Sequence, residues 1–356
     1  MAKKVIVGMS GGVDSSASAL LLKQQGYEVA GVYMKNWSQD LPGMKCPWAE
    51  DLADAKRVAV KLGIDFEVWD FEDEYRKKVV EYMLEEFRKG NTPNPDIMCN
   101  QEIKFKLFYE RAMEAGADFI ATGHYARTGS GPTLLRAVDE NKDQTYFLYR
   151  ISDEALAHTI FPIGGMKKPE VKELAAKHGL HNAYKKESMG VCFVGEVGMK
   201  DFLKEYIEVE PGEIREIENE RVLGYHEGAI FYTIGQRHGL YLDGEKGVTN
   251  DGMPYYVVKK DIARNIIYVS KNLNHEAIWT KELKLRDIIL RTQTAFSRTE
   301  AREKRVLVRL RHRAPLISAI LDGETLRFES EVKRPASGQS AVLYDGEICL
   351  GGGIIN

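Results

Sequence analysis

Strands and helices alternate along the first 125 residues, and this alternation constrains the fold more than any other feature of the sequence. Apolar runs typical of strands precede stretches with helical periodicity and a closing glycine. The strand-like runs span residues 3–9, 27–34, 64–71 and 117–124, and the helical stretches span 15–26, 49–63, 75–90 and 100–116. This order predicts an α/β fold with a doubly wound parallel sheet covered by helices on both faces. Ligands of such sheets bind at the carboxyl ends of the strands.

The pattern changes after about residue 197, where short strands and turns replace the long helices. Residues 273–356 are nearly all strand and turn, with repeated Asp-Gly-Glu turns between alternating runs. This pattern predicts a C-terminal β-barrel. We therefore expect a catalytic domain at 1–197, a small central domain at 198–272 and the barrel at 273–356, which suits a chain of 356 residues.

Composition excludes several classes of protein. No apolar run approaches the roughly 20 residues of a membrane span, and glycines interrupt any secretory signal, so we expect a cytoplasmic protein without a membrane partner. The net charge of −3 gives no general affinity for nucleic acid, so binding would need local basic surface. The four cysteines form no CxxC pair, so neither zinc nor a disulfide framework is expected.

A glycine-rich turn, GMSGGVDSS at residues 8–16, joins the first strand to the first helix. Its backbone N–H groups and hydroxyls suit a phosphate, helped by the helix N-terminus. Asp14 would repel phosphate unless a magnesium ion lies between them, which indicates a Mg-nucleotide. The alternative is a strand–helix turn capped by serine or aspartate.

Two cysteines lie in contexts that suit chemistry. Asn94 and Pro95 predict a helix start, with Asp96 in its first turn and Cys99 one turn later. A thiol there can have a lowered pKa, and Asp96 could exchange a proton with it or with a substrate. Cys192 has a glycine on each side, which suits a mobile loop. The alternatives are a capped helix with a buried cysteine, and a core strand.

The other two cysteines lack such contexts. Cys349 lies in an alternating strand and is expected in the core, and Cys46 stays unassigned.

The stretch KRVLVRLRHR at residues 304–313 alternates basic and apolar residues. A period of two would place Arg305, Arg309, Arg311 and Arg313 on one face of a strand and the apolar residues on the other. That basic face would bind phosphate, or would simply be solvated.

Six motifs in this order resemble the bacterial tRNA-specific 2-thiouridylase family over essentially the whole chain. They are SGGVDS, NPDIMCN, ATGHYAR, KDQTYFLYR, GVCFVG and YTIGQRHGL. The first alone matches the loop of the wider PP-loop ATP pyrophosphatases, which have an adenine nucleotide alpha hydrolase-like fold.

The resemblance implies ATP-dependent 2-thiolation of the wobble uridine of tRNA. Uridine O2 would be adenylated by Mg-ATP, and sulfur would come from a cysteine persulfide. The expected partners are tRNAs of the Lys, Glu and Gln types and a cysteine desulfurase or sulfur-relay protein as sulfur donor.

The resemblance also implies roles for single residues. Cys99 would be the nucleophile and Cys192 the persulfide carrier, with Asp96 as a third catalytic residue. The ATP-binding residues would be Gly8, Met9, Ser10, Gly11, Gly12, Val13, Asp14, Ser15, Met34 and Gly123. The residues facing the target base or tRNA would be Asn94, Pro95, Asp96, His124, Lys142, Asp143, Gln144, Arg311, His312 and Gln339.

Three other functions remain open. A PP-loop ligase that adenylates a small carboxylate would release pyrophosphate without tRNA. An RNA- or nucleotide-binding protein with structural cysteines would form no AMP. A thiolase of the same class could act at another RNA position.

Overall fold

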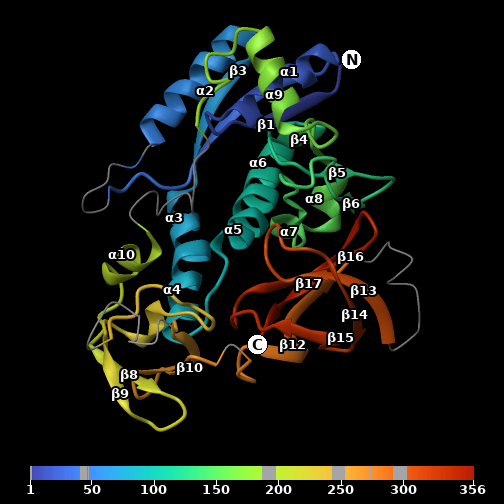
Figure 1. The fold of residues 1–356 in the computed structure, drawn as a ribbon. Helices are drawn as coiled ribbons and strands as arrows, with labels where there is room; N and C mark the ends of the chain where they lie inside the picture. The colour runs from blue at the N-terminus through green and yellow to red at the C-terminus, as the bar shows by residue number, and fades with distance from the viewer. Residues whose placement is uncertain are drawn as a thin grey trace.

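The computed structural model describes residues 2–40, 46, 48–186, 198–242, 253–272, 274–291 and 303–356. Five parallel strands form its first sheet, in the order β3-β2-β1-β4-β7 (Figure 1). Their bounds are β1 Lys4–Gly8, β2 Glu28–Lys35, β3 Asp65–Asp70, β4 Phe119–Thr122 and β7 Thr159–Ile160.

Alternation along β1 explains why helices cover both faces of this sheet. Val5 and Val7 pack with α1 (Val13–Gln24), α2 (Trp48–Leu62) and α9 (Lys168–Lys177). Ile6 points the other way and packs with the helices of residues 72–114. The doubly wound parallel sheet predicted from the sequence is therefore confirmed.

Two long helical segments contain π-helical turns. The first consists of α3 Glu72–Tyr75, η1 Arg76–Val80 and α4 Glu81–Arg88, and the second of α5 Pro95–Met98, η2 Cys99–Leu107 and α6 Phe108–Glu114. The backbone at Phe105 leaves helical geometry, with φ −112° and ψ 17°. Such wide turns occur frequently at functional sites. The first segment begins at Glu72, three residues before the predicted helix of residues 75–90, whereas the second begins at Pro95, where the cap residues predict a helix start.

Shorter elements follow the sheet and lead to the second half of the chain. They are β5 Arg127–Thr128, β6 Leu134–Leu135, α7 Thr145–Leu148, α8 Asp153–Ala157, α10 Met199–Lys204 and η3 Ala229–Phe231.

A mixed four-stranded sheet forms the centre of the chain, in the order β10-β11-β8-β9. Its strands are β8 Gly212–Glu216, β9 Val222–His226, β10 Tyr256–Asp261 and β11 Ile266–Ser270. Short strands and turns, predicted after about residue 197, are therefore present here. Leu242 forms one isolated bridge to Gly224, and 243–250 lie outside the described residues.

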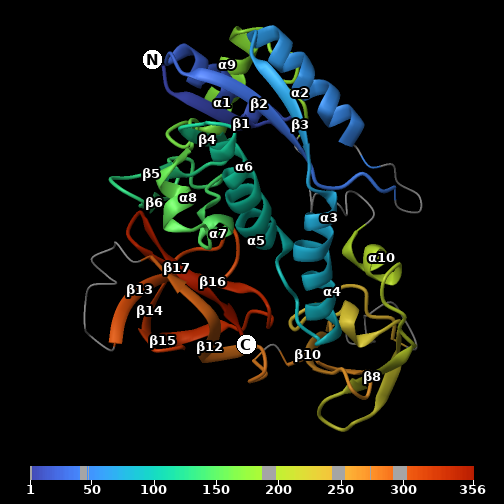
Figure 2. The ribbon, with the colours of Figure 1, turned by 180° about the vertical axis from the view of Figure 1, so that it is seen from behind.

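Six antiparallel strands form the C-terminal barrel, which pairing of β12 with β17 closes. They are β12 Trp279–Leu290, β13 Glu303–Arg309, β14 Ile317–Asp322, β15 Thr325–Lys333, β16 Ser340–Asp345 and β17 Ile348–Ile355. The predicted barrel is confirmed. β6 also pairs with β17, so the first part of the chain extends this sheet. Figures 1 and 2 show the barrel and central sheet beyond the parallel sheet, at the end opposite α1, α2 and α9.

The prediction that four arginines share one basic face of a strand is wrong. β13 ends at Arg309, so Arg311 and Arg313 lie beyond the strand, and only Arg305 is an exposed arginine within it. Arg309 is buried, and its guanidinium lies 2.6 Å from the carboxylate of Asp143. Residues 143–149 cover this end of the barrel, which the alternation along one strand could not reveal.

Cys349 is fully buried in β17, as predicted for a core residue, and burial raises the pKa of its thiol to about 11. No helix in the described part of the chain is long and apolar enough to cross a membrane.

Candidate ATP and tRNA site

The glycine-rich loop lies where the chain reverses its direction of winding across the sheet. β1 pairs with β2 on one side and with β4 on the other, so the loops after β1 and β4 meet at the carboxyl edge. Gly11 has φ +76°, and a Cβ atom there would lie 2.3 Å from the backbone oxygen of Asp51. A glycine is therefore required at this turn.

Serine hydroxyls inside the loop bind its own backbone. Ser15 Oγ accepts from the N–H of Ser10 at 3.2 Å and donates to the carbonyl of Gly12 at 3.1 Å. Gly12 is the cap residue of α1, and no side chain caps this helix. The alternative of a turn capped by serine or aspartate is therefore wrong, and the helix N-terminus suits an anion.

Residues from two other strands complete the predicted ATP-binding set. A Cβ on Gly8 would lie 2.8 Å from Cε of Met34, and a Cβ on Gly123 would lie 2.5 Å from the backbone nitrogen of Ser15. The ends of β2 and β4 thus pack directly against the loop and the end of β1. The structure brings all ten residues of this predicted set together.

Asp14 has partners that the sequence analysis missed. Its carboxylate oxygens lie 2.8 and 2.7 Å from the ammonium of Lys168, and one accepts a 2.9 Å hydrogen bond from the hydroxyl of Tyr125. Among the described residues, no group of three acidic, histidine or cysteine side chains could hold a metal.

The helix start predicted at Asn94 and Pro95 is confirmed. Asn94 Oδ1 accepts hydrogen bonds from the N–H groups of Asp96 and Ile97, and Pro95 occupies the first turn of α5. Burial raises the pKa of Asp96, and the nearby charge of Lys104 opposes this shift. Asp96 therefore holds a proton more readily than an ordinary aspartate.

His124 connects the two halves of the site. It follows Gly123, and its ring lies 5.7 Å from that of Phe105 in η2, the helical turn that begins at Cys99. Thr122 Oγ1 lies 2.8 Å from His124 Nδ1. Burial and the charge of Lys104 hold the pKa of His124 well below its usual range, so the ring is neutral at physiological pH.

Cys99 is the described cysteine with a place in this site. It is 2% exposed and follows the turn that carries Asp96. Cys192 lies outside the described residues. Cys46 is half-buried, burial raises the pKa of its thiol, and its sulfur lies 3.6 Å from the backbone oxygen of Trp37.

Comparisons with known proteins identify the family of this chain. The family model described as tRNA methyl transferase HUP domain matches residues 3–196. Two further models, tRNA methyl transferase PRC-barrel domain and Aminomethyltransferase beta-barrel domain, match 200–271 and 286–355. A protein named tRNA-specific 2-thiouridylase MnmA from Listeria welshimeri serovar 6b is 46% identical over 366 residues, covering 99% of this chain and 94% of the relative. The chain belongs to the tRNA-specific 2-thiouridylase family.

A second relative of the same name, from Pseudomonas entomophila, is 45% identical over 355 residues, with 99% of this chain and 94% of the relative covered. Among solved structures, a 4-thiouridine synthetase–RNA complex with bound ATP shares 18% identity and a TM-score of 0.38, with 57% of this chain and 50% of that chain covered. A likeness this partial carries no argument.

The tRNA contacts that the 2-thiouridylase family implies fall into an accessible and a buried group. Arg311 is exposed, Lys142 is half-buried, and Gln144 accepts a 2.8 Å hydrogen bond from the N–H of Tyr125, next to His124. Asp143 is 1% exposed, and its carboxylate binds Arg309 and the hydroxyl of Thr145. The Asp143 side chain is therefore bound within the protein, and a tRNA contact at this position stays a prediction.

Gln339 joins the barrel to the segment that is predicted to face the target base. Its Nε2 donates to the backbone oxygen of Thr92 at 2.6 Å, two residues before Asn94. His312 packs on Phe147 with ring centres 4.6 Å apart, and burial lowers its pKa to about 4. These contacts bring barrel residues to both predicted tRNA-facing segments.

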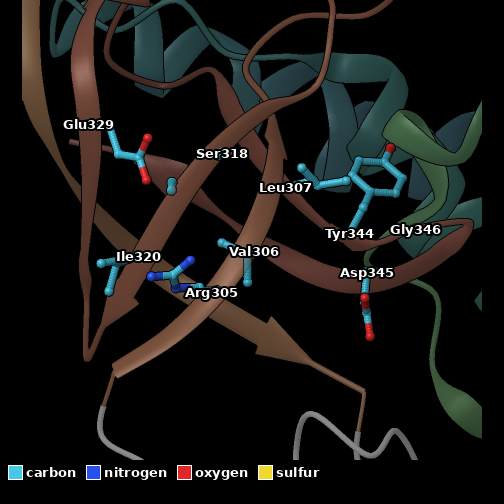
Figure 3. A pocket seen from close by; sticks show the side chains of 10 residues that line it. Arg305, Val306, Leu307, Ser318, Ile320, Glu329, Tyr344, Asp345 and Gly346 are labelled. Atoms are coloured by element: carbon cyan, nitrogen blue, oxygen red, sulfur yellow. The ribbon is translucent and has the colours of Figure 1, made fainter.

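The pocket in Figure 3 lies apart from these residues. It is a groove of about 240 Å³ between β13, β14 and β16, lined by Arg305, Glu329 and Asp345 among others. Ligand sites usually measure at least about 300 Å³. Of the residues predicted to bind ATP, tRNA or phosphate, only Arg305 of the basic strand face lines this groove. We assign it no role.

Proposed function

We propose that this chain uses ATP to convert the wobble uridine of tRNA to 2-thiouridine. The observation that carries the proposal is the double contact made by Gly123 and His124 at the end of β4. Gly123 touches the ATP loop, and His124 touches the helix that begins at Cys99. A base held beside Asp96 and Cys99 would therefore lie near the phosphates of a nucleotide in the loop.

The first step is adenylation of uridine O2. The oxygen attacks the α-phosphate of Mg-ATP, and pyrophosphate leaves into the N–H groups of the loop, which stabilise the developing charge. The raised pKa of Asp96 suits a group that exchanges a proton with the base. A neutral His124 can accept or donate a hydrogen bond without adding charge.

The second step replaces the activated oxygen by sulfur. A persulfide on Cys192 attacks C2 with its terminal sulfur, and AMP leaves. The Cys99 thiolate then attacks Cys192 Sγ, which frees the thiouridine and forms a Cys99–Cys192 disulfide. Alternatively, Cys99 first releases hydrosulfide, which then attacks C2. In either route a reductant must clear the disulfide.

The proposal includes the partners. A cysteine desulfurase or a sulfur-relay protein would load Cys192, and the substrates would be tRNAs of the Lys, Glu and Gln types, in the cytoplasm. Arg311, Lys142 and Gln339 would meet the anticodon arm, whose single-stranded bases can be splayed out at low cost.

Mass spectrometry of tRNA nucleosides from cells with and without the protein tests this function. We expect 2-thiouridine derivatives to disappear when the protein is absent. Purified protein should form AMP and pyrophosphate only with tRNA present. Pyrophosphate release that needs a small carboxylate instead would support a PP-loop ligase, and no AMP under any condition would support a binding protein.

A further inference from the structure

Asn182 is a buried amide that binds the ATP loop from a distant part of the chain. It is 1% exposed and follows α9. Its Nδ2 donates to the carbonyl of Gly11 at 2.9 Å and to Ser16 Oγ at 2.9 Å. Because a carbonyl oxygen can only accept, the amide nitrogen must be the atom that faces Gly11.

Ser16 links Asn182 to the carbonyl of Gly12. Its hydroxyl accepts from Asn182 and donates to the backbone oxygen of Gly12 at 2.9 Å. Asn182 thus holds the carbonyl of Gly11 directly. It supports the carbonyl of Gly12 only through Ser16 Oγ, because the Gly12 oxygen also accepts from the backbone N–H of Ser16 at 3.3 Å and from Ser15 Oγ at 3.1 Å.

The direction of these carbonyls decides what the loop offers to a ligand. In a planar trans peptide, the C=O and the following N–H point in opposite directions. With the Gly11 oxygen held by Asn182, the N–H of Gly12 points away from Asn182. With the Gly12 oxygen held by Ser15 and Ser16, the N–H of Val13 is likewise turned away from them. Such N–H groups bind anions, whereas flipped peptides would present carbonyl oxygens to phosphate.

Glycine alone does not enforce this arrangement, since it adopts either sign of φ with little penalty. A side chain from outside the loop must therefore select the orientation of the Gly11–Gly12 peptide. Asn182 suits this role because its own neighbours are fixed. His181 Nε2 lies 2.8 Å from one carboxylate oxygen of Asp54, and Lys185 Nζ lies 2.6 Å from the other.

Asp54, which binds both His181 and Lys185, is itself held in a buried and charged state. Asp54 is 6% exposed. Burial raises its pKa, but the hydrogen bonds from Lys185 and His181 outweigh burial, so the net pKa is lowered and the carboxylate stays charged. Lys185 also binds Asp51, whose backbone lies against Gly11. Within the described part of the chain, Asn182 Oδ1 is buried and accepts no hydrogen bond. The amide therefore leaves its acceptor unsatisfied while it donates twice to the loop.

We infer that Asn182 is a positioning residue for the ATP phosphates, which holds the Gly11–Gly12 peptide with its N–H group turned toward the ligand and supports the Gly12–Val13 peptide through Ser16. The inference rests on the proposed function, since it takes the loop to be the ATP site.

The test compares binding of ATP and of adenosine, which lacks phosphates. Asn182→Asp keeps the shape but replaces the donor by an oxygen that repels the Gly11 carbonyl. We expect ATP affinity to fall by about tenfold or more, as for loss of one or two hydrogen bonds. Adenosine and tRNA affinities should not change. Asn182→Thr, which keeps a donor, should bind ATP more tightly than Asn182→Ala.

Two serines of α1 provide a matched pair. Ser16→Ala removes the relay and should weaken ATP binding but spare adenosine. Ser18→Ala removes a hydroxyl two residues further on, which binds the carbonyls of Asp14 and Thr122, and should change neither affinity.

Wild-type ATP affinity in Asn182→Asp, or equal losses for ATP and adenosine, would overturn the inference. If Asn182→Asp does not fold, the comparison of Asn182→Ala with Asn182→Thr decides, and equal ATP affinities would overturn it. Failure of the wild-type protein to form AMP with tRNA would instead refute the proposed function.

Discussion

Burial raises the pKa of Asp96, although Lys104 acts in the opposite direction. The folded state therefore binds this proton more tightly than the unfolded state, and stability falls as pH rises from the unfolded pKa through the raised folded pKa. At neutral pH the ionised carboxylate costs stability. We expect denaturant titrations at neutral pH to give Asp96→Asn an equal or larger free energy of unfolding than the wild-type protein. Above pH 4 the free energy of unfolding of this variant should depend less on pH. If Asp96 moves a proton, thiolation should fall by about 100-fold or more. A less stable variant at pH 7 would contradict the assignment of burial as the dominant effect.

The end of β13 distinguishes a structural arginine from one available to RNA. Arg309 is buried against Asp143, whereas Arg311 is exposed beyond the strand. Removing one partner of a buried pair typically costs about 3–5 kcal/mol, so Arg309→Ala should lower the free energy of unfolding by that amount. Arg311→Ala should leave stability unchanged and reduce the salt dependence of tRNA binding by roughly one phosphate contact. Denaturant titration and binding at several salt concentrations measure both. A loss of stability in Arg311→Ala, with none in Arg309→Ala, would instead support the alternative of a solvated basic strand face.

The contact between α7 and the barrel should also be sensitive to acid. Burial lowers the pKa of His312 to about 4. The unfolded state thus takes up a proton that the folded state refuses, so stability is full above about pH 6.5 and is lost as pH falls toward 4. After a discount for partial exposure, the loss is on the order of 1–2 kcal/mol. His312→Gln should flatten this part of the pH profile of unfolding. An unchanged slope between pH 6.5 and 4.5 would show that other groups cause it.

At the scale of the whole molecule, the C-terminal barrel is joined to a helical segment of the first part of the chain. Gln339 binds Thr92, and Arg286 of β12 lies 2.5 Å from the buried carboxylate of Glu86 in α4. The barrel is therefore fixed to the helical segment that leads to Asn94.

We predict distinct phenotypes for the four cysteines. Cys192→Ser should lose persulfide loading and thiolation but keep AMP formation. Cys99→Ser should accept the persulfide yet fail to complete the transfer. Cys46→Ser and Cys349→Ser should thiolate at nearly the wild-type rate. Thiolation assays beside a disulfide map after one turnover check these outcomes. Wild-type thiolation by Cys192→Ser with a persulfide donor would exclude the proposed route.

The sequence by itself determined the elements and the class of chemistry. Hydrophobic periodicity specified the parallel sheet and the barrel, because burial of one face imposes a period of two on strands and 3.6 on helices. The loop after β1 and the start of α5 were predictable since caps and glycine turns depend on local backbone geometry. The resemblance to the 2-thiouridylases, rather than spacing, supplied the residue roles.

Tertiary structure alone decided which charged and polar side chains serve the site and which serve the fold. Lys168 and Asn182 reach the ATP loop from more than 150 residues away. Asp143 and Arg309, which looked like surface residues, neutralise each other where two parts of the chain pack together. No local pattern encodes such pairs, because burial of a charge depends on what a distant segment places over it.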